Sequence, residues 1–188
     1  EFRETNGYLN FSAAQVVVFG DFYTQSTSEK NQVSSSATLE LKGSLRHIGD
    51  TYFKGNGRLV FSGEEEQHLS FDDTQKVNLG YILIENQGQK LYADTRIYSP
   101  TFLTPARIVG EYVEIEGGAS KYEVISEGNY LIQTKIPFLS SSNLHVTGDL
   151  RIQSMDEEGI FGPTDGYMRL TYAAQTVLVD GDFYSQSI

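Results

Sequence analysis

Apolar and polar residues alternate in two short runs within residues 57–71, and a polar turn separates the runs. The first run, at 57–62, reads Gly-Arg-Leu-Val-Phe-Ser, and the second, at 67–71, reads Gln-His-Leu-Ser-Phe. Alternation of this kind, bounded by turn residues, is typical of a half-buried β-strand. The stretch therefore predicts two short strands that each direct one face into a core.

The same pattern opens and closes the chain. Residues 7–19 read Gly-x-Leu-x-Phe-Ser, a short turn and Gln-x-Val-x-Phe, and residues 166–179 read Gly-x-Met-x-Leu-Thr, a short turn and Gln-x-Val-x-Val. A further segment, Gly-Asp-Phe-Tyr-(Thr or Ser)-Gln-Ser, follows in both places, at 20–26 and at 181–187, so these two copies lie 161 residues apart. Such repetition indicates that one structural unit recurs along the chain.

A second pattern recurs within the first period. Segment 34–46 is matched by segment 140–151, with leucine and glycine at the same relative positions 105 residues on. We therefore predict a single all-β repeat module over residues 1–188, made of one period of about 161 residues and an overlap in which 7–26 and 166–187 are equivalent copies. Because the chain begins in the middle of such a pattern, we expect it to be a fragment of a longer protein.

The repeats favour one all-β architecture. No segment sustains apolar residues at helical spacing with caps at both ends. A motif that returns at both ends of a chain is expected when strands wind into stacked rungs, because each rung buries its apolar face only against its neighbours. We predict a right-handed parallel β-solenoid (β-helix) of short stacked rungs. The alternative is a β-sandwich, which also has turns about every ten residues.

The inward face of these strands is predicted from the alternation. Its members are large apolar residues at every second position, namely Leu9, Phe11, Val17, Phe19, Leu39, Leu41, Leu59, Phe61, Leu69, Phe71, Val177 and Val179. Residues 96–139 follow the pattern poorly, so a bulge or an insertion is expected there.

Composition narrows the possible partners. The chain carries a formal net charge of −11, which argues against nucleic acid and against an anionic membrane surface, since both require clustered Lys and Arg. No apolar run approaches the length of a membrane span, so membrane insertion is not expected. The absence of cysteine removes disulfides, thiolate metal sites and cysteine nucleophiles.

Several stretches are similar to repeat modules of large bacterial cell-surface and secreted proteins, loosely akin to filamentous-haemagglutinin-type adhesins. They are Leu39-x-Leu41-x-Gly43-x-Leu45, residues 55–63 with Gln67 and Phe71, and residues 81–86 continuing to Ala93-Asp94. The resemblance covers roughly residues 7–95 and returns at 140–188. It implies a β-solenoid and an extracellular location at the cell surface, and it supplies no catalytic residue.

Acidic residues near the first strand pair are candidate metal ligands. These weak calcium candidates are Glu64, Glu65, Glu66, Asp72 and Asp73, because hard cations prefer several oxygen ligands. The alternative is a solvated turn, since the equivalent turn near the N-terminus contains only alanines. The aspartates of the Gly-Asp repeats, Asp21, Asp149 and Asp182, fit either an acidic ladder or turns capped on their own backbone. We predict no cofactor, no metal and no catalytic residue.

Glutamines and tyrosines of the repeats are candidate ligand contacts. The weak candidates for binding a glycan are Tyr23, Tyr184, Gln15, Gln67 and Gln175. A tyrosine offers a flat face to a sugar ring, and a glutamine offers hydrogen bonds. The alternative is structural, with the tyrosines covering the core and the glutamines satisfying backbone groups at a turn. The three histidines, His47, His68 and His145, share no metal-ligand spacing.

Three functions are compatible with these observations. The leading one is a non-enzymatic structural stalk or adhesin segment of a repetitive bacterial surface protein. Its expected partners are neighbouring repeats of the same chain and a host or environmental glycan or protein. The second is a carbohydrate-binding module that uses exposed tyrosines. The third is a β-helical polysaccharide-degrading enzyme, which needs converging Asp, Arg or Lys residues.

Overall fold

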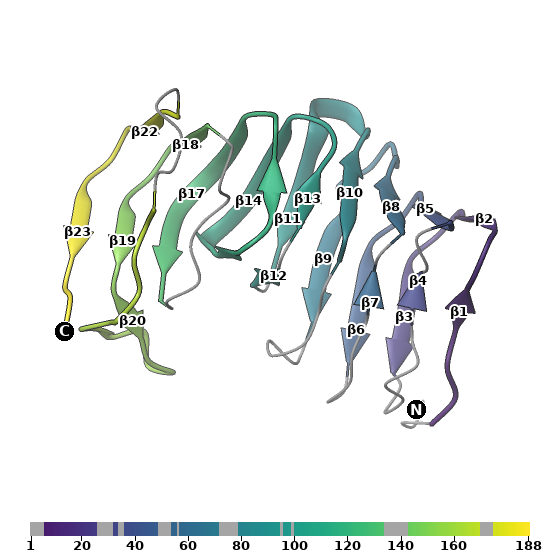
Figure 1. Ribbon diagram of the computed structural model, residues 1–188, viewed down its shortest axis with the longest axis horizontal. Helices are drawn as coiled ribbons and strands as arrows, with labels where there is room; N and C mark the ends of the chain where they lie inside the picture. The colour runs from purple at the N-terminus through teal and green to yellow at the C-terminus, as the bar shows by residue number, and fades with distance from the viewer. Residues whose placement is uncertain are drawn as a thin grey trace.

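The structure is a parallel β-solenoid whose rungs stack along the long axis of the molecule, with the two termini at opposite ends (Figure 1). This computed structural model describes residues 6–25, 32–33, 36–48, 54–55, 57–71, 79–94, 96–98, 100–133, 143–169 and 175–188. Within these residues the one helical element is a 3-10 turn, η1 (Gln87–Gln89), and no helix has the length and apolar character that a membrane span requires. The predicted parallel solenoid is confirmed over the β-sandwich.

Parallel strands from successive rungs form three larger sheets and one separate pair in the described part of the chain. The smallest contains β1 (Asn10–Phe11), β4 (Gln32–Val33) and β7 (Lys54–Gly55), and β12 (Ile97–Tyr98) pairs separately with β15 (Ile115–Glu116). A six-stranded sheet contains β2 (Gln15–Val18), β5 (Thr38–Leu41), β8 (Arg58–Phe61), β10 (Tyr81–Ile84), β13 (Thr101–Phe102) and β16 (Ala119–Ser120). Each element of these sheets therefore recurs once per rung.

A ten-stranded sheet forms the longest face. It contains β3 (Phe22–Gln25), β6 (Leu45–Ile48), β9 (His68–Phe71), β11 (Lys90–Ala93), β14 (Ala106–Val113), β17 (Val124–Ile132), β18 (Leu144–Val146), β19 (Leu150–Ile152), β22 (Val177–Val179) and β23 (Phe183–Ser185). A short antiparallel pair, β20 (Ser154–Met155) with β21 (Phe161–Gly162), lies outside the three sheets.

In-register pairing places like side chains above one another in the core. Leu39 pairs with Leu59, which pairs with Ile82, and Leu45 pairs with Leu69. Each of these side chains is at most 2% exposed. The core is therefore a set of apolar columns that run along the solenoid axis, and each rung contributes one or two residues per strand to them.

The predicted inward face is correct in the middle rungs. The six predicted residues that are buried there are Leu39, Leu41, Leu59, Phe61, Leu69 and Phe71. In the last rung, Val177 and Val179 are half-buried and pack against the core, as predicted.

The prediction is wrong for most of the first rung. Leu9, Val17 and Phe19 are 48%, 38% and 84% exposed. Val16 and Val18 pack against the core instead, because they pair in register with Leu39 and Leu41, and this pairing turns Val17 outward. Since side chains alternate along a strand, a one-residue error in aligning the repeats exchanges the two faces. Phe11 is half-buried and packs against the core as predicted.

Within the described part of residues 96–139, two long strands, β14 and β17, interrupt the repeat. The pairing of β14 with β17 shifts register between Val109 and Tyr112, which confirms the expected bulge. The first half of β17 then pairs with β18, and the second half pairs with β19. As a result β18 lies in the ten-stranded sheet, whereas β5, its counterpart 105 residues earlier, lies in the six-stranded sheet. The repeat is thus displaced by one face around the solenoid after the bulge.

Candidate functional site

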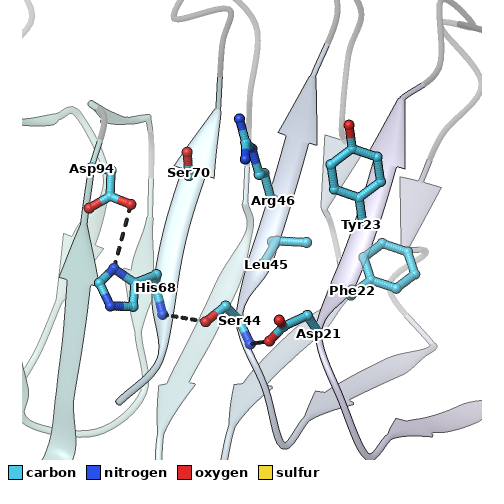
Figure 2. A pocket seen from close by; sticks show the side chains of 9 residues that line it. All are labelled: Asp21, Phe22, Tyr23, Ser44, Leu45, Arg46, His68, Ser70 and Asp94. Carbon is cyan, nitrogen blue, oxygen red and sulfur yellow. Dashed lines mark hydrogen bonds and ion pairs between the residues drawn. The ribbon is translucent and has the colours of Figure 1, made fainter. Parts of the chain in front are cut away.

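Two rows of side chains project from the outer face of the ten-stranded sheet, because alternate residues of a strand face the same side and successive rungs stack in register. The first row consists of Asp21, Ser44, His68 and Tyr92. The second row consists of Tyr23, Arg46, Ser70 and Asp94. Residues of both rows, Tyr92 excepted, line an open groove of about 340 Å³, which we call the outer groove (Figure 2). Phe22 and Leu45 complete its lining.

Hydrogen bonds fix the first row from rung to rung. The backbone N–H of Ser44 donates to Asp21 Oδ1 at 2.7 Å, and the backbone N–H of His68 donates to Ser44 Oγ at 2.9 Å (Figure 2). The His68 ring stacks on Tyr92 with 4.9 Å between the ring centroids. Tyr92 in turn donates its hydroxyl to Glu66 at 2.9 Å, and this carboxylate raises the pKa of Tyr92. One wall of the outer groove is therefore pre-organised.

The second row combines engaged and free polar groups, since Tyr23 donates its hydroxyl to Gln25 Oε1 at 3.4 Å and Asp94 pairs with His68. Arg46 is exposed, and within the described part of the chain it has no carboxylate partner and Ser70 Oγ has no hydrogen-bond partner. The Tyr23 ring is 46% exposed. Asp94 Oδ2 lies 3.5 Å from His68 Nδ1. The outer groove thus offers an aromatic face, a guanidinium, a hydroxyl and an acid–histidine pair to solvent.

The sequence analysis missed most of the outer groove, although a signal was present. Positions 46, 70 and 94 are 24 residues apart, as are positions 44, 68 and 92. This spacing equals the length of a rung in this part of the chain. Polar residues at that spacing therefore face one groove, and a search for the rung length would have grouped them.

The aspartates of the Gly-Asp repeats join neighbouring rungs. The backbone N–H of Asp149 donates to Asn129 Oδ1 at 2.9 Å, and the N–H of Asp182 donates to Asp149 Oδ1 at 3.0 Å. These contacts differ from both sequence interpretations, since the acceptor receives the backbone of the next rung. The bond from Asp182, followed by that from Arg151, lowers the pKa of Asp149 despite partial burial.

The glutamine candidates occupy three different environments. Gln67 is fully buried, and its amide donates to the carbonyls of Leu41 and Gly43 at 3.0 and 2.6 Å. Its Oε1 accepts the backbone N–H of Gly63 at 2.9 Å, so Gln67 satisfies a turn as the structural alternative predicted. Gln15 is exposed. Gln175 is half-buried.

The acidic candidates that the structure describes, Glu64, Glu65 and Glu66, do not converge with histidine on a cation position. Glu64, Glu65 and Glu66 are exposed and border a shallow depression beside Lys90. Asp72 and Asp73 lie outside the described residues. Among the residues that the structure describes, no three acids or histidines are arranged to hold a metal ion.

Tyr184 differs from its counterpart Tyr23 in what covers its ring. The Arg151 guanidinium lies 3.9 Å from the centroid of the Tyr184 ring and 4.4 Å from that of Phe161. Arg151 is also paired with Asp149 at 2.8 Å. One face of Tyr184 is therefore occupied by a cation–π contact. Tyr23 is the more accessible of the two candidate tyrosines.

A largely buried ion cluster within the irregular segment was not predicted from the sequence. Arg96 Nε lies 3.0 Å from Glu114 Oε2, and Arg96 Nη1 lies 3.1 Å from Glu116 Oε1. Burial lowers the pKa of Arg96, but attraction to Glu114 and its hydrogen bonds outweigh this and raise the pKa above its ordinary value. The three side chains are 17%, 14% and 8% exposed. The cluster therefore joins the segments of β12 and β15.

Comparison with protein-family models, with curated proteins and with solved structures finds no significant match. The class that the chain itself defines is the parallel β-solenoid with internal repeats.

Proposed function

We propose that the chain is a non-enzymatic structural segment of a repetitive extracellular protein, a stalk or adhesin rod at a bacterial cell surface. One observation carries this proposal. The strands β2 and β3 of the first rung and the strands β22 and β23 of the last rung come from equivalent sequence segments, and they lie at opposite ends of the solenoid (Figure 1). A following period would therefore stack on β22 and β23 as β5 and β6 stack on β2 and β3.

The mechanical basis of such a rod is the continuous backbone ladder. Every rung donates and accepts hydrogen bonds along the solenoid axis, so bending requires many bonds to distort together. In a linear array each unit is stabilised mainly through its neighbours. A rod of this kind holds a distal binding region away from the cell, and its partners include neighbouring repeats of the same chain.

The test compares this chain with a protein that contains two tandem periods. The two-period protein should unfold at a higher guanidinium concentration, because one additional interface is buried. The single period should show weak head-to-tail association in sedimentation, because the backbone N–H and C=O groups of its end strands can pair with those of another copy. Because the net charge of −11 opposes association, salt should strengthen it. Identical midpoints and a strict monomer at every salt concentration would contradict the continuous rod.

Carbohydrate binding is the second candidate function, and the outer groove favours it. The groove combines an exposed aromatic ring with several hydrogen-bonding groups, which is the chemistry that a sugar requires. A host or environmental glycan is the corresponding partner. A glycan array tests this candidate without reference to the rod.

Polysaccharide degradation is supported less well. Arg96, Glu114 and Glu116 converge, but they are mostly buried and are held by one another. An assay for new reducing ends after incubation with polysaccharides distinguishes this candidate from simple binding.

A further inference from the structure

We propose that the outer groove binds an acidic saccharide, with a uronic-acid carboxylate on Arg46 and a sugar ring on Tyr23. This inference rests on the carbohydrate-binding candidate and is independent of the structural role of the rod. It adds a ligand class and a set of contact residues to that candidate.

Arg46 favours an acidic ligand, because it has no carboxylate partner among the described residues. Strands of the ten-stranded sheet contain three other basic residues whose side chains the structure describes, and each has a carboxylate partner. Lys90 pairs with Glu127 at 2.9 Å, Arg107 pairs with Glu127 at 2.6 Å, and Arg151 pairs with Asp149 at 2.8 Å. Arg46 has no such partner within the described residues, although the chain is strongly acidic. A planar guanidinium that is free and exposed in a groove is suited to bidentate contact with a carboxylate.

The residues beside Arg46 favour a saccharide over other anionic ligands. Tyr23 is in register with Arg46 on one side, and Ser70 is in register with it on the other. The aromatic face suits the apolar face of a sugar ring, and the serine hydroxyl suits a sugar hydroxyl. With about 4.8 Å between strands, the distance from Tyr23 to Ser70 is roughly 10 Å, which accommodates a short oligosaccharide.

The acids of the outer groove limit the number of anionic groups that a ligand can place in it. Asp21 and Asp94 border the groove at its two ends. Their charges oppose phosphate-rich polymers, but carboxylates readily accept hydrogen bonds from sugar hydroxyls. His68 adds a further polar group, and its stacking on Tyr92 holds its ring in place. A ligand with one carboxylate and several hydroxyls per ring matches this distribution.

The test is calorimetric titration with a short galacturonate oligomer and with the neutral galactose oligomer of equal length, at low and high salt. The unchanged protein should prefer the acidic oligomer. Arg46→Gln should reduce the affinity for the acidic oligomer by about ten- to a hundredfold, because a charged hydrogen bond is lost. It should leave binding of the neutral oligomer unchanged. Tyr23→Ala should weaken binding of both oligomers.

Arg58→Gln is the matched control. Arg58 is also an exposed strand arginine in register with an exposed tyrosine, Tyr81, but it lies on the six-stranded sheet outside the outer groove. Its replacement should change neither affinity. Guanidinium midpoints equal to that of the unchanged protein establish that each variant is folded.

Two results would overturn the proposal. Equal affinity of the unchanged protein for both oligomers, or an Arg46→Gln variant that keeps its preference, would refute the acidic-ligand site but leave carbohydrate binding in place. No binding of either oligomer by the folded protein, together with a negative glycan array, would refute both. Neither result bears on the rod, which the unfolding comparison tests separately.

Discussion

The carboxylate of Asp149 accepts a hydrogen bond from the backbone N–H of Asp182, 3.0 Å away on the next rung. Asn129 accepts the N–H of Asp149 in the same way, and Asp21 accepts the N–H of Ser44. One acceptor side chain on each of these rungs thus fixes the corner between two strands. Asp182 stands at the same position on the last rung, where its carboxylate accepts the hydroxyl of Tyr184 at 3.2 Å.

Asp182→Ala should therefore have different effects in one period and in two. In the single period the side chain is exposed and bonds no further rung, so the free energy of unfolding should change by at most about 0.5 kcal/mol. In a two-period protein the carboxylate should accept the next backbone N–H, and its loss should cost about 1 kcal/mol. Guanidinium unfolding of the unchanged protein and the variant, each as one period and as two periods, measures the two changes in stability. Equal small effects in both proteins would show that the corner ladder does not cross between periods.

The Asp149–Asp182 hydrogen bond should be sensitive to acid. Because the bond lowers the pKa of Asp149 in the folded protein, its stabilisation is present above the ordinary carboxyl pKa and is lost as pH falls through the folded value. Asp149→Asn keeps an acceptor oxygen, as Asn129 does, but does not titrate. The stability difference between the unchanged protein and the variant should therefore shrink between about pH 7 and pH 3. Unfolding midpoints at the two pH values check this, and a constant difference would contradict it.

Leu59→Ala should lower the free energy of unfolding by about 2 to 5 kcal/mol, because it removes a buried side chain between Leu39 and Ile82 in an apolar column. Val17→Ala is the control. Val17 faces outward in the structure, so its replacement should cost at most about 0.5 kcal/mol. Chemical unfolding of both variants distinguishes the inward from the outward face. A loss of stability well above about 0.5 kcal/mol for Val17→Ala would show that Val17 faces the core, as the sequence predicted.

Gln67→Glu should destabilise the protein by about 3 kcal/mol or more. The substitution places a carboxylate against the carbonyls of Leu41 and Gly43, which now accept hydrogen bonds from the Gln67 amide. Acidification should recover part of the loss, since a protonated carboxyl can donate one bond. The same change at exposed Gln15 should cost far less, because its carboxylate would stay solvated even beside Glu40. Thermal unfolding at neutral and acidic pH provides the measurement, and equal effects at the two glutamines would argue against the buried role of Gln67.

Replacing Glu64, Glu65 and Glu66 together by alanine should change stability by at most about 1 kcal/mol. These acids are exposed. The loss of the hydrogen bond from Tyr92 to Glu66 is expected to account for any decrease in stability. Added calcium should not alter the unfolding midpoint of either protein. Calorimetry that detects tight calcium binding, abolished by the triple replacement, would instead support a metal site.

The sequence predicted what depends on local alternation and on repetition. Leu39, Leu59 and Leu69 were assigned to the core because each belongs to a clear alternating strand. Val17 was misassigned because Gln15 and Gln175 lie 160 residues apart whereas the Gly-Asp segments that follow them lie 161 apart, so the equivalent of Val177 is Val16. Alternation alone cannot place a strand that is shifted by one residue. The outer groove depends on which residues meet across rungs, so it required the register of Tyr23, Arg46 and Ser70. The Arg96 cluster joins segments that carry no repeat at all.

The displacement of the repeat by one face after the bulge has a consequence for the proposed rod. If successive periods stacked without it, every outer groove would point the same way, and the rod would adhere along a single side. With the displacement between β5 and β18, each new period of the proposed rod would be rotated relative to the one before it. Copies of the groove would then follow a spiral path along the rod. A surrounding matrix could be engaged from several directions at once, and avidity would come from the spiral rather than from the strength of one contact.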